Sequence, residues 1–129
     1  LSGRQLVVLK LMGNHEGNIT PPPELAAANP GMDEYSLSLL YFDETLRQLV
    51  GEMKQCPDLA AILYLPDHGK NYVTEEKIPF LIHLSDRFRR AHPELERKLR
   101  KELSKPFMSA DVFRIMLELL GVSNPDMQI

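Results

Sequence analysis

The chain has 129 residues, of which 43% are hydrophobic and 26% are charged, so a globular domain with a buried core is expected and nothing indicates disorder. With 15 basic and 18 acidic side chains, the formal charge of −3 gives no overall attraction to nucleic acid or to anionic lipid. The single cysteine, Cys56, excludes an internal disulfide and a cysteine metal cluster. No apolar run approaches the ~20 residues needed to span a bilayer.

The first predicted element is a strand at residues 6–12. This apolar run contains β-branched side chains, a pattern typical of an interior strand of a parallel sheet that is covered on both faces. Such a strand needs neighbours, and the chain lacks an initiator Met, so we expect the chain to be part of a longer protein. Residues 13–31, rich in Gly, Asn and Pro, predict a long loop.

Further along the chain, helices and strands follow in turn. Apolar residues at spacings of three and four predict a helix at residues 33–55, with Asp33 as its N-cap and Pro57 beyond its end. Short apolar runs predict strands at residues 60–65 and 78–84. Further helices are predicted at 93–103 and from 109 to about Gly121. This order predicts part of an α/β fold, a three-layer α/β/α sandwich with a largely parallel sheet.

Asp67-His68-Gly69 directly follows the second predicted strand, where open α/β sheets place their ligand sites. A carboxylate and an imidazole on one tight turn can both face a divalent cation, and oxygen and nitrogen ligands suit zinc. The alternative is that Asp67 and Gly69 only build the turn while His68 is solvated.

His15 also follows the end of a predicted strand. If the strands are parallel, as the helix between them implies, both loops open on one rim, and His15 and His68 could reach a shared ligand. Taken alone, His15 is more often a loop residue that is hydrogen-bonded to nearby backbone.

Several segments together resemble the phosphoethanolamine transferases of the alkaline phosphatase/sulfatase superfamily. Residues 8–15 resemble a strand and loop in which Gly-Asn-His or Gly-Ser-His supplies a histidine. Residues 34–43 resemble that family's helix pattern, although Ser36 and Leu37 replace an Asp-Asn pair. Residues 63–69, Leu-Tyr-Leu-Pro-Asp-His-Gly, resemble Leu-Tyr-Val-Ser-Asp-His-Gly, the most specific part of the match. Residues 78–86 and 108–122 resemble the segments that follow.

The resemblance implies that residues 1–129 are the C-terminal portion of an alkaline-phosphatase-like catalytic domain. It implies zinc as the cofactor, Asp67 and His68 as metal ligands, and His15 as a residue that binds the phosphoethanolamine group. The complete enzyme would transfer phosphoethanolamine from a phospholipid to lipid A or another envelope glycan, through a covalent phospho-threonine intermediate. It would lie in the bacterial inner membrane, held by an anchor outside this chain, with its catalytic domain in the periplasm. Nucleic acid is not an expected partner, and the oligomeric state is open, a monomer included.

The chain also departs from the family pattern. Lys70 stands where the family usually has Glu, and the histidine expected in the next loop is absent. The resemblance places the threonine nucleophile and the remaining zinc ligands upstream, so no catalytic residue is assigned here and the chain alone is expected to be inactive. Two alternatives stay open, a sulfatase or phosphodiesterase of the same superfamily, and a binding module without catalysis.

The other histidines and the basic stretch carry less functional weight. His83 lies within a predicted strand and fits a core imidazole, whereas His92 precedes Pro93 and fits a solvated surface residue. Residues 87–101 are locally basic but include Glu94 and Glu96. This pattern favours a solvated helical face, with a lipid headgroup or membrane surface as the less favoured alternative.

Overall fold

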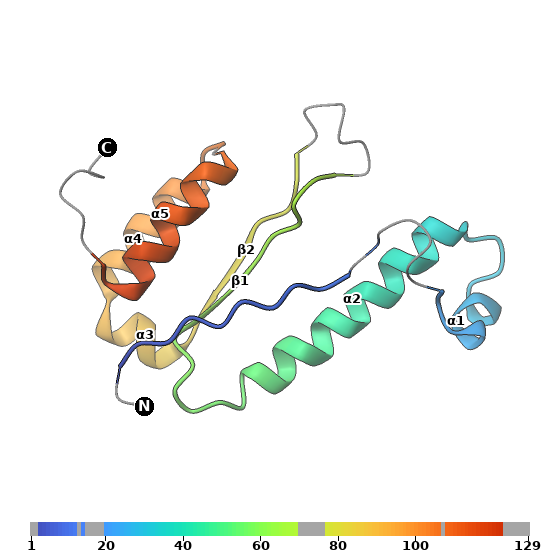
Figure 1. Ribbon diagram of the computed structural model, residues 1–129, viewed down its shortest axis with the longest axis horizontal. Coiled ribbons are helices and arrows are strands. Elements are labelled where there is room, and N and C mark those ends of the chain that lie inside the picture. Colours follow the sequence, from blue (N-terminus) through green and yellow to red (C-terminus); the bar gives the residue numbers. More distant parts are fainter. Residues whose placement is uncertain (1–2, 13, 15–19, 70–76, 107, 123–129) are drawn as a thin grey trace. The chain divides into compact units, whose positions relative to one another are not determined.

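The computed structural model describes residues 3–12, 14, 20–69, 77–106 and 108–122. In these residues it contains five helices and two strands (Figure 1). The chain divides into two compact units, one formed by Leu1–Leu6 with Asp58–Ile129 and the other by Val7–Pro57. Both strands and the Asp67-His68-Gly69 turn belong to the first of these units. No helix in the described residues is both long and apolar enough to cross a membrane.

The unit formed by Val7–Pro57 contains helices α1 (Pro23–Ala28) and α2 (Glu34–Met53). Asp33 caps α2, since its carboxylate accepts hydrogen bonds from the backbone N–H of Ser36 at 3.1 Å and from the Ser36 hydroxyl at 2.5 Å. These bonds favour the ionised form and lower the pKa of Asp33. Buried side chains of α2 are Leu37 and Ser38, which lie in its first turns.

The other unit contains a short hairpin of strands β1 (Ala61–Tyr64) and β2 (Leu81–Leu84). The strands are antiparallel, and their register runs from Ala61 opposite Leu84 to Tyr64 opposite Leu81. The backbone N–H of Ser85 donates to the Ala60 carbonyl at 2.9 Å and extends the pairing by one bond. Within the described residues the sheet consists of these two strands alone.

Three helices follow the hairpin, α3 (Asp86–Ala91), α4 (Pro93–Leu103) and α5 (Ser109–Leu120). Ser85 caps α3, because its hydroxyl accepts from the Phe88 N–H at 3.2 Å. Helix α5 ends at Leu120, and its C-cap Gly121 has a φ of 65°, in the left-handed region that favours glycine. The Arg4 guanidinium donates a hydrogen bond to the Leu120 carbonyl at the end of α5, where the last carbonyl groups of a helix have no partner within the helix itself.

Helices α4 and α5 form the apolar core of this unit. Leu99 of α4 and Ile115 of α5 are each 2% exposed, and Val112 is 6% exposed. Two cross-helix ion pairs lie beside this core, Lys98 Nζ to Glu118 Oε1 at 2.8 Å and Arg114 to Glu102 at 3.3 Å. Each pair is partly exposed and contributes about 1 kcal/mol or less. Burial of the three apolar side chains therefore contributes more to the stability of this unit than the two ion pairs do.

The predicted fold class, an alkaline-phosphatase-like three-layer α/β/α sandwich with a largely parallel sheet, is wrong. The described residues form a mixed domain that is mainly helical, with two antiparallel strands. Parallel pairing requires a crossover connection, usually a helix, between the strands. Residues 65–69 and 77–80 between β1 and β2 contain no helix, and the chain returns antiparallel to its first strand.

The strand predicted at residues 6–12 is also absent from the structure. This segment forms no strand, and its side chains are exposed, with Val7 72% and Val8 76% accessible. An apolar, β-branched run becomes a strand only when another strand satisfies its backbone, because its propensity reflects packing against neighbours. Residues 6–12 have a composition that favours a strand, but neither of the two described strands pairs with them.

The remaining predicted elements are confirmed. Strands β1 and β2 lie within the predicted runs, and α4 has the predicted bounds. Asp33 precedes α2, and α5 runs from Ser109 to Leu120 before Gly121. Two short helices were not predicted, α1 inside the expected loop and α3 after β2. Their signals were Pro23 at a first helical position and Ser85 as an N-cap.

Leu99→Ala should lower the free energy of unfolding by about 2 to 5 kcal/mol, because it removes a buried side chain and leaves a cavity in the core. Urea unfolding followed by circular dichroism measures this loss. The matched control is Leu39→Ala on α2, where the side chain is 43% exposed and the change should be small. Equal losses in the two variants would show that α4 and α5 do not form a core.

Candidate functional site

The Asp67-His68-Gly69 turn lies just beyond the end of β1, in the connection to β2. The strand ends at Tyr64, and Pro66 follows, which has no backbone N–H to continue a ladder. Asp67 and His68 are exposed, and the Asp67 side chain is 91% accessible. The turn therefore presents both side chains to solvent, where a ligand can reach them.

Hydrogen bonds within the turn fix how His68 is held. Its Nδ1 lies 2.6 Å from the Gly69 carbonyl oxygen. A carbonyl only accepts hydrogen bonds, so this contact requires the proton on Nδ1 and leaves the lone pair of the neutral ring on Nε2. The backbone N–H of His68 donates to Asp67 Oδ1 at 3.1 Å. The turn thus orients the imidazole through the Gly69 carbonyl and the carboxylate through the His68 backbone.

The spacing of the two side chains can be compared with the size of a zinc site. Asp67 Oδ1 lies 3.9 Å from His68 Nε2. Two ligand atoms bound at ~2.0–2.1 Å are separated by about 3.4 Å at a tetrahedral angle and by at most about 4.1 Å. The observed distance lies above the tetrahedral value and below the upper limit. The two atoms could therefore bind one cation after a rotation of the exposed Asp67 side chain that shortens the distance between them.

The Gly69 carbonyl is the part of this site that the sequence did not reveal. Histidines that bind metals through Nε2 commonly donate Nδ1–H to a carbonyl or carboxylate, which fixes the tautomer and the ring orientation. In the sequence, Gly69 indicated only a tight turn. The signal that could have been used is its position directly after the histidine, where its carbonyl can fold back onto the ring.

The described residues bring no third ligand to the turn. Within the ranges that the structure describes, no group of three His, Cys, Asp or Glu side chains could hold a metal ion. His15, predicted to share the site, lies outside the described residues. The basis for its predicted convergence with Asp67 is wrong, because residues 6–12 form no strand and β1 pairs antiparallel with β2.

The other histidines lie in structural settings. His83 is half-buried in β2, opposite Ile62, in accordance with its expected place in a strand. His92 is exposed, as predicted, between α3 and α4, and its ring centroid lies 4.6 Å from that of Phe88. This ring contact and the position between two helices account for His92 without a ligand.

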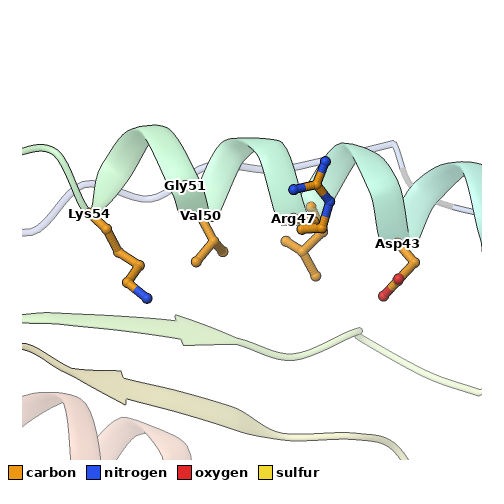
Figure 2. A pocket seen from close by; sticks show the side chains of 6 residues that line it. Asp43, Arg47, Val50, Gly51 and Lys54 are labelled. Carbon is orange, nitrogen blue, oxygen red and sulfur yellow. The ribbon is translucent and has the colours of Figure 1, made fainter.

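A shallow hollow lies along α2, and none of the residues that line it is a candidate metal ligand. Figure 2 shows the side chains of Asp43, Arg47, Val50 and Lys54 along this face of the helix. Arg47 makes two hydrogen bonds of 2.7 Å to Glu44, which lower the pKa of that carboxyl to about 2. All the lining residues belong to α2 or to its C-cap Lys54, and the one arginine among them already pairs with Glu44, so we assign no site to the hollow.

Comparison with known proteins adds no relative. No family model matches the chain, and neither a curated protein nor a solved structure matches it. The functional interpretation therefore depends on the sequence motifs and on the geometry of the turn.

In its neutral form the His68 ring should carry its proton on Nδ1, because only that tautomer can donate to the Gly69 carbonyl. Nitrogen NMR of the histidine-labelled chain distinguishes the two tautomers directly. His92→Ala assigns one of the remaining signals and leaves the His68 signal in place. A His68 ring with its proton mainly on Nε2 would show that the Gly69 contact does not form in solution.

Proposed function

We propose that Asp67 and His68 are two ligands of a zinc ion in a phosphoethanolamine transferase. The complete protein would move phosphoethanolamine from a phospholipid to lipid A or another envelope glycan, at the periplasmic side of a bacterial inner membrane. The observation that carries the proposal is the 3.9 Å separation of Asp67 Oδ1 and His68 Nε2 on an exposed turn. The resemblance of residues 63–69 to the metal-binding segment of that family supplies the reaction.

Each residue of the turn has a distinct part in this proposal. His68 binds through Nε2, and the Gly69 carbonyl holds its other nitrogen, so the ring is oriented before a ligand arrives. Asp67 contributes a negative charge that offsets part of the charge of a divalent cation. Bound zinc would lower the pKa of a hydroxyl nucleophile and neutralise charge that develops on the phosphoryl oxygens.

Other groups that the reaction needs are assigned outside this turn. By resemblance, His15 contacts the phosphoryl group, and the threonine nucleophile and the remaining ligands belong to residues outside this chain. A zinc site normally has at least three protein ligands. The proposal therefore assigns weak zinc binding and no transfer activity to the 129 residues alone.

Zinc titration followed by calorimetry should detect weak binding to the chain, and His68→Ala or Asp67→Asn should lower the affinity about tenfold or more, since each removes one ligand. His92→Ala and Asp43→Asn are the matched controls, because both parent residues are exposed and lie outside the turn. Equal affinity in the two ligand variants and the two controls would contradict the metal assignment.

In the complete protein, Asp67→Asn or His68→Ala should reduce turnover by orders of magnitude and leave the circular dichroism spectrum unchanged. His15→Ala should do less damage, because it removes one contact worth about 2 to 4 kcal/mol in the transition state. Transfer of labelled phosphoethanolamine to the acceptor, measured with metal content, checks both effects. Full activity in a ligand variant with unchanged metal content would show that the turn has no catalytic part.

A further inference from the structure

The basic side chains of this protein are concentrated in one part of the chain. Residues 86–105, which include α3 and α4, contain eight Lys or Arg and four Asp or Glu, although the whole chain has a formal charge of −3. A local excess of positive charge on an acidic protein attracts anions to one face only. An anionic partner could therefore bind where basic side chains of this stretch pair with no carboxylate.

Most of these cations are compensated by carboxylates. Arg87 pairs with Asp58 at 3.0 Å, Arg89 with Asp86 at 2.6 Å, and Arg100 with Glu96 at 2.8 Å. Arg97 pairs with Glu94, and Lys98 with Glu118. No described carboxylate pairs with Arg90, Lys101 or Lys105. Two of these three, Lys101 and Lys105, lie at the C-terminal end of α4.

Two large apolar side chains lie at the same end of the α4 and α5 pair. Met108, just before α5, is 73% exposed, and Phe113 in the second turn of α5 is 57% exposed. The Met108 N–H donates to Asp111 Oδ2 at 2.9 Å, which fixes the start of α5. Because Val112 and Ile115 occupy the buried side of that helix, Phe113 is left in solvent.

The cross-helix ion pairs establish that these residues share one end. Arg114 meets Glu102, and Glu118 meets Lys98, so α4 and α5 are antiparallel, as Figure 1 shows. The end of α4 and the start of α5 are therefore neighbours. We call Lys101, Lys105, Met108 and Phe113 the helix-pair tip.

We propose that the helix-pair tip docks on the surface of an anionic membrane. Lysines beside exposed apolar side chains are the combination that binds at the level of lipid headgroups, where the charges meet phosphates and the apolar groups enter the acyl boundary. Single-stranded nucleic acid fits less well, because its sites combine a basic groove with several stacking aromatics, and of the four named tip residues only Phe113 is aromatic. This surface does not depend on the proposed zinc site.

A competing explanation for the lysines is structural. Lys101 lies in the last turn of α4, where a positive charge also stabilises the negative end of the helix dipole. That role explains a lysine but not the exposure of Met108 and Phe113 beside it. Lipid binding and helix stability are therefore measured separately in each variant.

Sedimentation with vesicles of phosphatidylcholine containing phosphatidylglycerol should show binding that weakens with added salt and is much lower on phosphatidylcholine alone. Lys101→Gln with Lys105→Gln should lower the partition coefficient about 30-fold, since each basic residue near the surface is worth ~1 kcal/mol. Met108→Ser with Phe113→Ser should lower it about tenfold or more. Phe113→Trp should retain binding and shift its fluorescence to the blue as the indole ring leaves water.

The control variants remove lysines or exposed apolar surface at other places in the chain. Lys54→Gln with Lys77→Gln removes two exposed lysines elsewhere, and Met12→Ser removes an apolar side chain that is 62% exposed. Neither should reduce binding as the tip variants do, and thermal unfolding should be similar throughout. Equal losses in tip and control variants, an unshifted indole emission in the Phe113→Trp variant, or binding of single-stranded RNA in place of vesicles would each overturn the proposal.

Discussion

Burial of the apolar faces of α4 and α5 is the constraint on which the unit formed by Leu1–Leu6 and Asp58–Ile129 depends. Leu99 of α4 and Ile115 of α5 are its most completely buried side chains. Because little other apolar surface is fully buried in the described residues, this burial offsets much of the conformational entropy of ordering both helices. The ion pairs beside it set the relative register of α4 and α5 more than they add stability.

The two proposed metal ligands lie outside the helices that form the core, in the connection between β1 and β2. Asp67 and His68 lie on the connection of a two-stranded hairpin, and an isolated hairpin is only marginally stable in water. What orients them is local, namely the Gly69 carbonyl and the His68 backbone N–H. A metal site built on such a turn owes its geometry to its own hydrogen bonds and to its further ligands, and less to a rigid sheet.

Local elements were predictable from the sequence because their signals are local. Asp33 marked the start of α2, Gly121 marked the end of α5, and the spacing of leucines marked α4. Pairing of strands was not predictable, because it depends on which segments meet. Residues 6–12 have the composition of a strand but no strand neighbour, and β1 meets β2 without a crossover helix in the described residues. For the candidate site, residue type and position in the sequence pointed to Asp67 and His68, whereas the Gly69 contact is evident only in the three-dimensional structure.

The bond from Arg4 to the Leu120 carbonyl links the two ends of the described chain. Helices α4 and α5 are joined by a short connection, so they can meet early in folding, whereas Arg4 must close a loop of more than a hundred residues. The bond is exposed to solvent, which limits its net contribution to stability. Arg4 thus joins the segment at the start of the described chain to the end of α5, whereas the buried side chains of α4 and α5 supply most of the stability of the two helices.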